Sequence, residues 1–466
     1  MPNSRNSASS SGAESDESTK DKVIKGVTFL GAANIVVRFI SFFSVLLSVR
    51  ALTVFEYGIF TLFLSLTGPM HSLVSLGGVD DLIVSDVSVS LGKRDTARAK
   101  SILTHFFRFR LLLLVIGLLA VFISRNFLQE RYGEEIVRYF WLFVILVSCQ
   151  FIRNIYILVF NIYEKFKLLS YANIAEVVLR FIFIAAFFIF QELNVYSLIL
   201  VYILGTAFEV LLFTGPAVKI WERLRAAPLL GRELIFDIFK RYGKWQIISE
   251  IISSPVNALR YWLIKVFVSV EAIGLLGLAQ SLFSVLASLV PLRAVILPIV
   301  TKKAHDKPLF TNLLQKLSKY SMAVHILLVL AAQMVFAPLI PWVFPKYALS
   351  IPLFRLLSLR LLLNSTSITH LVAIMAYHRQ KFLVFSGLLV LLSVLTLSPP
   401  LMLKFGVSGS VMESLIAALI IAVFREIYLR KRVGVSTISF KSFFTIDETD
   451  RIILRELYSK ARKYLP

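Results

Sequence analysis

The chain has 466 residues, of which 57% are hydrophobic and 17% are charged, and its formal net charge is +22. A mean hydropathy of +0.78 is more than a soluble globular protein can bury, so the composition indicates a polytopic membrane protein. Apolar runs of about 20 residues recur, which predicts helical spans and excludes a transmembrane β-barrel. The single cysteine, Cys149, excludes a disulfide within the chain.

Residues 1–22 are polar and serine-rich, which predicts a disordered cytoplasmic tail that is not a cleaved signal. Apolar runs bounded by charges, glycine or proline then predict twelve transmembrane helices. Gly68, Pro69, Gly77 and Gly78 interrupt the second run and predict a kinked helix there. The predicted spans are 23–49, 58–91, 102–124, 137–160, 168–190, 195–217, 243–264, 273–300, 313–338, 349–377, 382–403 and 406–429.

These spans divide into two six-helix bundles, at residues 23–218 and 243–430, joined by a basic cytoplasmic linker at 219–242. Residues 431–466 form a cytoplasmic tail in which Thr445–Tyr464 has the pattern of an amphipathic helix that begins with a capping box. We expect this helix to lie on the anionic inner leaflet or to dock on the inner loops.

Most of the 50 Lys and Arg residues fall in segments that face the same side as the N-terminus. The positive-inside rule therefore places both termini in the cytoplasm of a cell-membrane protein. Basic residues distributed over every inner loop are typical of membrane topology, so the charge does not indicate nucleic-acid binding.

An internal repeat becomes visible when Gly58 is aligned with Gly274, an offset of 216 residues. Val54, Gly58, Ser65 and Leu66 then match Val270, Gly274, Ser281 and Leu282. Because six spans per half is an even number, the two halves enter the membrane from the same side. This predicts a parallel pseudo-two-fold repeat about an axis along the membrane normal.

Catalytic motifs are absent from the sequence: there is no Walker A motif, no HExxH motif and no Cys/His cluster. The predicted external loops are short and leave no room for a soluble catalytic domain. We therefore expect a secondary-type transporter rather than an enzyme, with no metal and no cofactor. Coupling to H⁺ or Na⁺ stays open.

Ionisable residues within spans are costly, so they usually face a cavity or a partner. Arg153, Glu176 and Arg180 are predicted to form a structural ionic cluster. Glu209 and Glu413 lie near span ends and are expected to reach the membrane interface.

Three arginines on the first two helices of one half or the other, Arg38, Arg260 and Arg293, are the candidate substrate-binding residues. An arginine fork matches the geometry of phosphate. The alternative is that Asp80, Asp81 or Glu250 pairs with these arginines, and the same carboxylates are also candidate ion-coupling residues.

Motifs of the first hundred residues resemble the polysaccharide (O-antigen type) flippase family, whose superfamily includes multidrug and toxic compound extruders and lipid II flippases. The motifs are Lys25-Gly26 followed by Asn34 and Arg38, the stretch from Ala51 to Gly58 before Ser65-Leu66, Leu76-Gly77-Gly78, and the stretch from Leu91 to Asp95. The resemblance implies two bundles that alternate around a central cavity lined by spans 1, 2, 7 and 8. Asp80-Asp81 departs from the basic residue that many relatives tend to have there.

The resemblance implies a flippase that moves a polyprenyl-(di)phosphate-linked oligosaccharide to the outer leaflet for cell-surface glycan assembly. The implied partners are this lipid-linked oligosaccharide, membrane lipids and glycan-assembly enzymes. Two alternatives stay open: a cation-coupled multidrug exporter with an acidic cavity, and a membrane-embedded glycan polymerase or glycosyltransferase.

Overall fold

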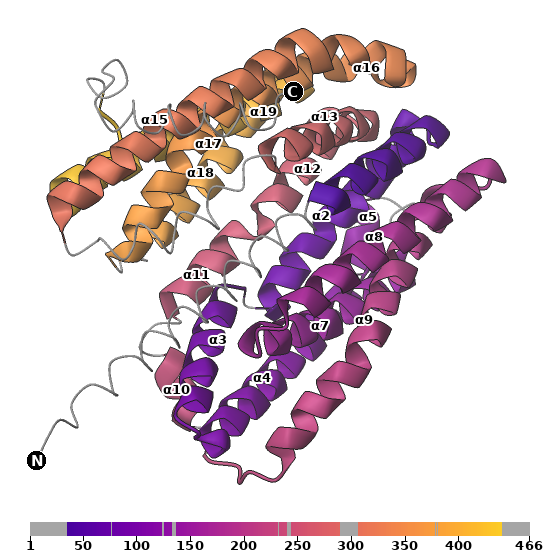
Figure 1. Cartoon of the computed structure of the whole chain (residues 1–466). Helices are drawn as coiled ribbons and strands as arrows, with labels where there is room; N and C mark the ends of the chain where they lie inside the picture. The colour runs from indigo at the N-terminus through magenta and orange to yellow at the C-terminus, as the bar shows by residue number, and fades with distance from the viewer. Residues whose placement is uncertain are drawn as a thin grey trace, which may run out of the picture.

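The computed structural model describes residues 35–75, 77–123, 125–132, 137–231, 233–239, 244–288, 306–377, 379 and 381–439. Every regular element in these ranges is a helix (Figure 1). The predicted N-terminal tail, the predicted amphipathic helix from Thr445 to Tyr464 and the candidate residue Arg293 lie outside the described residues.

The helices of the first half are coloured indigo to magenta in Figure 1. A helix of residues 35–51 comes first. The α2 helix begins where Thr53 and Glu56 form a capping box: the Glu56 carboxylate accepts from the Thr53 backbone N–H (2.9 Å), and the Thr53 hydroxyl accepts from the Glu56 N–H (3.2 Å). The labelled helices of this half are α2 (Val54–Ser75), α3 (Gly77–Gly92), α4 (Thr96–Ile123), α5 (Arg125–Tyr132), α7 (Phe140–Ile162), α8 (Phe166–Ile189) and α9 (Val195–Arg225).

The second half follows the short helix α10 (Glu233–Ile238). Pro255 occupies the first turn of α12 and separates it from α11, because proline is tolerated at a helix start but not in its interior. The helices of this half are α11 (Lys244–Ser253), α12 (Pro255–Phe267), α13 (Val270–Ser288), α15 (Lys307–Ala331), η2 (Ala332–Phe336), α16 (Ala337–Val343), η3 (Pro345–Ser350), α17 (Ile351–Ala376), α18 (Lys381–Phe405), α19 (Val407–Tyr428) and η4 (Leu429–Val433).

Nine helical segments of the described chain are long and apolar enough to cross a membrane. The remaining predicted spans correspond to the helix of residues 35–51, to α2 with α3, and to α11 with α12. The prediction of an all-helical polytopic protein with about twelve spans is thus confirmed. Of the residues expected to kink the second span, Pro69 lies inside α2 and Gly77 is the first residue of α3.

The two halves meet most closely where α2 crosses α13. A Cβ atom added to Gly58 would clash with the Val270 carbonyl oxygen, and one added to Gly274 would clash with the Val54 carbonyl oxygen. The contact is reciprocal, since each glycine meets the valine of the other half, and the repeat equates these two valines with each other. This is the geometry expected for a pseudo-two-fold axis between the halves.

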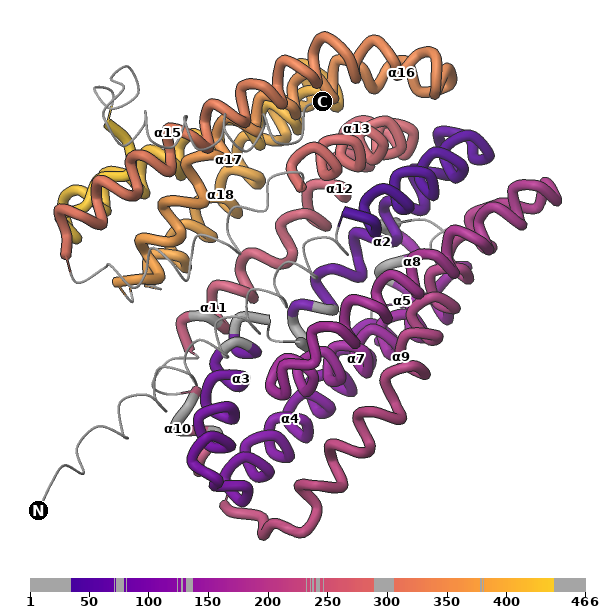
Figure 2. The backbone as a smooth tube through the Cα atoms, in the orientation of Figure 1, coloured from indigo at the N-terminus to yellow at the C-terminus, as the bar shows by residue number. Residues whose placement is uncertain are grey.

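The largest apolar core runs through both halves and includes Leu62 and Leu198 from the first, and Leu282 and Phe354 from the second. Farther from the glycine crossing, α11 lies between α3 and α18 and contacts both (Figure 2). The halves are therefore joined at the glycine crossing and through α11.

Candidate functional site

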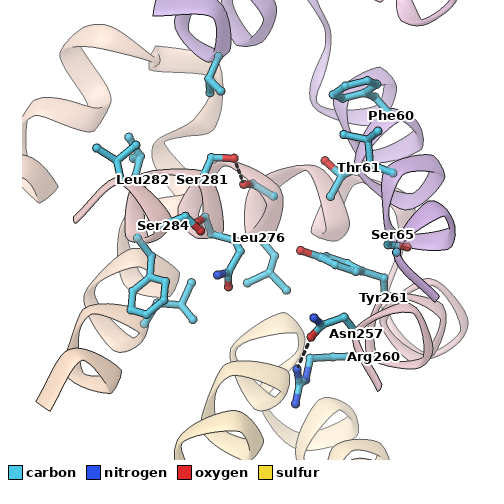
Figure 3. A pocket seen from close by; sticks show the side chains of 18 of the residues that line it. Phe60, Thr61, Ser65, Asn257, Arg260, Tyr261, Leu276, Ser281, Leu282 and Ser284 are labelled. Carbon is cyan, nitrogen blue, oxygen red and sulfur yellow. Dashed lines mark hydrogen bonds between the residues drawn. The ribbon is translucent and has the colours of Figure 1, made fainter. Parts of the chain in front are cut away.

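A cavity of about 830 Å³ lies between the two halves (Figure 3). Residues from the helix of residues 35–51 and from α2, α9, α11, α12, α13, α17 and α19 line it. It is rich in serine, but several hydroxyls donate to carbonyl oxygens of their own helix. Ser48 donates to Ser44 (2.8 Å), and Ser281 donates to Gly277 (2.9 Å). These hydroxyls are already satisfied, so the charged side chains dominate the chemistry of the cavity.

Positive charge predominates in this lining. Among the lining residues that the structure describes, the charged ones are Arg38, Arg260, Arg360 and Glu250. Three guanidinium groups and one carboxylate leave an excess of cations in the lining. Such a cavity favours anionic groups and disfavours organic cations.

Arg260 on α12 is held by two neighbours. Its Nε and Nη2 atoms donate to Oε2 of Glu413 at 3.1 and 3.0 Å, and its Nη1 donates to Oδ1 of Asn257 at 3.3 Å. In Figure 3, Arg260 extends toward the pale C-terminal helices with Asn257 beside it. Glu413 on α19 has no exposed surface, and its Oε1 atom has no hydrogen-bond partner among the residues that the structure describes.

Arg360 on α17 supplies a second cation at the same place. It is half-buried, lines the cavity together with Asn364, and lies within electrostatic range of Arg260 and Glu413. No carboxylate of the described chain forms an ion pair with it. We call Arg260, Arg360 and Glu413 the C-terminal arginine site.

The structure describes two of the three candidate substrate-binding arginines. Arg38 and Arg260 line the same cavity, and Arg38 is exposed, whereas Arg293 is outside the described residues. The carboxylate that pairs with Arg260 in the described part of the chain is Glu413, whereas the alternative from the sequence was Asp80, Asp81 or Glu250.

The three candidate carboxylates also occupy different places. Glu250 lines the cavity. Asp80 is not among the lining residues, because its carboxylate binds the buried Arg110 on α4 at 3.2 Å. The expectation that Asp80 pairs in the cavity is therefore corrected. The side chain of Asp81 lies outside the described part of the structure.

A second group of charges lies wholly within the first half. Arg153 pairs with Glu209, and Arg180 pairs with Glu176 one turn away. The Arg180 guanidinium also stacks 4.1 Å from the ring centre of Tyr202. We call Arg153, Glu176, Arg180 and Glu209 the N-terminal ionic cluster, and none of the four lines the cavity.

The expected interfacial positions of Glu209 and Glu413 are wrong. The two residues are only 2% and 0% exposed, respectively, because each is buried against an arginine of a neighbouring helix. Sequence analysis also did not single out Arg110, which is fully buried beside Asp80. Arg110 could have been identified in the sequence as a charged residue within an apolar run.

Both the sequence and the fold resemble those of known proteins. Residues 23–304 match the profile of a family described as polysaccharide biosynthesis protein. A search of curated protein sequences finds no match.

Solved structures share the fold at low sequence identity. The lipid II flippase MurJ, in an inward closed conformation, is 15% identical, with a TM-score of 0.67 over 91% of this chain and 93% of that one. A multidrug resistance MATE transporter of the MOP superfamily, in an inward-facing conformation, is 14% identical, with a TM-score of 0.65 over 85% and 94%.

A MOP superfamily transporter from Pyrococcus furiosus, whose binding pocket is described as having reverse polarity, is 15% identical, with a TM-score of 0.57 over 88% of this chain and 96% of that one. At such low sequence identities, the structural similarity shows a shared fold alone. The match to the family profile covers more than half of the 466 residues. The chain therefore belongs to the polysaccharide biosynthesis protein family and has the fold of the MOP superfamily transporters.

Proposed function

We propose that this protein is a flippase that moves a polyprenyl-(di)phosphate-linked oligosaccharide from the cytoplasmic to the outer leaflet of the cell membrane. It would act by alternating access, as a transporter and not as an enzyme, in a pathway whose glycan-assembly enzymes are its functional partners. The bodies that move would be the bundles 23–218 and 243–430, joined by the basic linker 219–242. The distribution of basic residues supports cytoplasmic termini.

The observation that carries this proposal is the excess of arginine in the cavity between the halves. Arg360 lines the cavity without an ion-pair partner in the described chain, next to Arg260. Two neighbouring guanidinium groups suit the two phosphates of a diphosphate, because each can form charge-assisted, bidentate hydrogen bonds. The serines and asparagines around them suit the hydroxyl groups of a sugar.

A multidrug exporter of the same superfamily is the second candidate, and Glu250 in the cavity lining is the observation in its favour. A cation exporter needs carboxylates to predominate where its substrate binds. Three lining arginines against one glutamate favour an anionic substrate instead.

Transbilayer movement of a fluorescent polyprenyl-diphosphate oligosaccharide in proteoliposomes tests the proposal. We expect movement with the native protein and at least about tenfold slower movement with Arg360→Ala, since a lost charge-assisted hydrogen bond costs about 1.5–3 kcal/mol. Arg355→Ala is the matched control, because Arg355 lies on the same helix, is exposed and does not line the cavity. Failure to move any lipid-linked glycan, together with ion-driven export of a cationic dye, would reject the flippase.

A further inference from the structure

Glu413 has an unusual position relative to the cavity. Its neighbours Ser410, Val411 and Ser414 line the cavity, while Glu413 itself is fully buried behind them. The polar groups that face it are Arg260 of α12, which bonds its Oε2 atom, and Arg360 of α17, which lies within electrostatic range. Glu413 therefore contacts the cavity only through the lining arginine that it holds.

Three of the five N–H donors of Arg260 are used in this arrangement. Its Nε and Nη2 atoms both bond the same oxygen of Glu413, and its Nη1 atom bonds Asn257. A phosphate that enters the cavity can form a bidentate bond with the Nε–Nη2 edge of Arg260 only if these two donors leave Glu413. The carboxylate and the phosphate thus compete for this edge of the guanidinium.

Glu413 also gains less from this pairing than a purely structural carboxylate would. Its Oε1 atom lies in the protein interior without a hydrogen-bond partner in the described part of the chain, and a buried polar atom without a partner is costly. A pairing with one oxygen unsatisfied is easier to exchange than one in which every donor and acceptor is matched.

We infer that Glu413 is an internal counter-anion, which occupies Arg260 while the cavity is empty and releases it to the diphosphate of the substrate. This inference rests on the proposed function. Two consequences follow: Glu413 weakens substrate binding by competition, and it neutralises Arg260 so that the empty carrier can return across the membrane. A buried guanidinium without a partner would oppose that return.

Glu413→Gln separates these two effects, because glutamine keeps the shape of the side chain but loses the charge. The first measurement is binding of farnesyl-diphosphate-linked N-acetylglucosamine to the purified full chain. We expect affinity to rise about tenfold, since the competitor is removed. The second measurement is transport in proteoliposomes, where we expect exchange of labelled for unlabelled substrate to continue and net one-way movement to fall at least tenfold.

Glu209→Gln is the matched control. Glu209 is as deeply buried as Glu413 and also pairs with an arginine, but neither Glu209 nor its partner Arg153 lines the cavity. We expect no change of affinity in this variant. An equal rise would show a general effect of removing buried negative charge and would overturn the inference.

The outcomes distinguish the inference from the function on which it rests. If the native protein binds and moves the probe but Glu413→Gln leaves the affinity unchanged or lowers it, the inference is wrong and the flippase stands. If the native protein neither binds nor moves the probe, the proposed function fails. Should Glu413→Gln not yield monodisperse protein, Glu413→Asp replaces it. Its shorter carboxylate should hold Arg260 less well and raise affinity by a smaller factor, and an unchanged or lower affinity would again overturn the inference.

Discussion

The two halves contain similar charged groups in opposite settings. In the N-terminal ionic cluster, two arginines meet two glutamates, and none of the four residues lines the cavity. In the C-terminal arginine site, Glu413 pairs with Arg260, Arg360 lies within electrostatic range of both, and both arginines line the cavity. A balanced buried cluster fixes helix packing, whereas an excess of cations at a cavity is available to a ligand. The same residue types are therefore balanced and away from the cavity in one half, and in excess at the cavity in the other.

The internal repeat identifies one position at which the two halves differ in charge. Ser44 lies 216 residues before Arg260, so the repeat equates the two positions, and both residues line the cavity. Ser44 donates to the carbonyl oxygen of Ile40 in its own helix (3.1 Å), while Arg260 carries a charge to the cavity. The repeat preserves the frame of the helices, while Arg260 adds a charge to the cavity lining that the equivalent position of the first half lacks.

The largest effect is expected from breaking the N-terminal ionic cluster. Glu176→Ala leaves the buried guanidinium of Arg180 without its ion-pair partner, which should destabilise the protein by about 3 kcal/mol and lower the unfolding midpoint in detergent by several degrees. Transport per folded molecule should change little. Normal stability combined with lost transport would show that this cluster serves the substrate, and the contrast between the halves would fail.

Removing the whole Arg260–Glu413 pair should affect binding and leave stability nearly unchanged. In Arg260→Ser combined with Glu413→Gln no buried charge loses its partner, and replacement of a complete ion pair is often neutral for stability. We expect affinity for the diphosphate probe to fall about ten- to a hundredfold, which titration of the purified protein would measure. The matched variant, Arg153→Gln with Glu209→Gln, removes the corresponding pair of the first half and should bind as the native protein does. Equal losses in both double variants would mean that the cavity responds to overall charge.

Sequence reasoning reached the fold and the pairing of Glu176 with Arg180, but it missed the pairing of Arg260 with Glu413. Hydropathy identified the spans because each must be apolar over the thickness of the bilayer. The alignment of Gly58 with Gly274 predicted the repeat, and the reciprocal crossing of α2 and α13 agrees with it. The rotation of each helix about its axis cannot be read in this way, since lipid and protein interior are equally apolar. For that reason the bond between Arg260 and Glu413, which are 153 residues apart, and the burial of Glu413 could not be foreseen.

A substitution at the glycine crossing tests whether the two halves move apart there. Gly58→Ala adds a methyl group against the Val270 carbonyl, which should separate α2 from α13 at a cost of about 1–3 kcal/mol. We expect labelling of Ser281→Cys by a membrane-impermeant maleimide from outside the cell to rise several-fold, in a background where the one native cysteine is replaced by Cys149→Ala. Gly92→Ala is the control, because nothing lies within 4 Å of the added atom. Unchanged labelling in Gly58→Ala would mean that the crossing does not open.

The smallest expected effect concerns Tyr202, a side chain that links the N-terminal ionic cluster to the cavity. Tyr202 lines the cavity while its ring stacks on Arg180 at 4.1 Å. Tyr202→Leu removes the cation–π contact and should cost about 1 kcal/mol of stability, whereas Tyr202→Phe keeps a ring and should cost less. Affinity for the diphosphate probe should change less than about twofold in either variant, because Arg180 stays paired with Glu176. A tenfold loss of affinity in Tyr202→Leu alone would mean that Arg180 acts on the substrate through this ring. The cationic surface that Arg38 contributes from the first half would then include Arg180 as well, and the substrate would be held from both sides of the pseudo-two-fold axis.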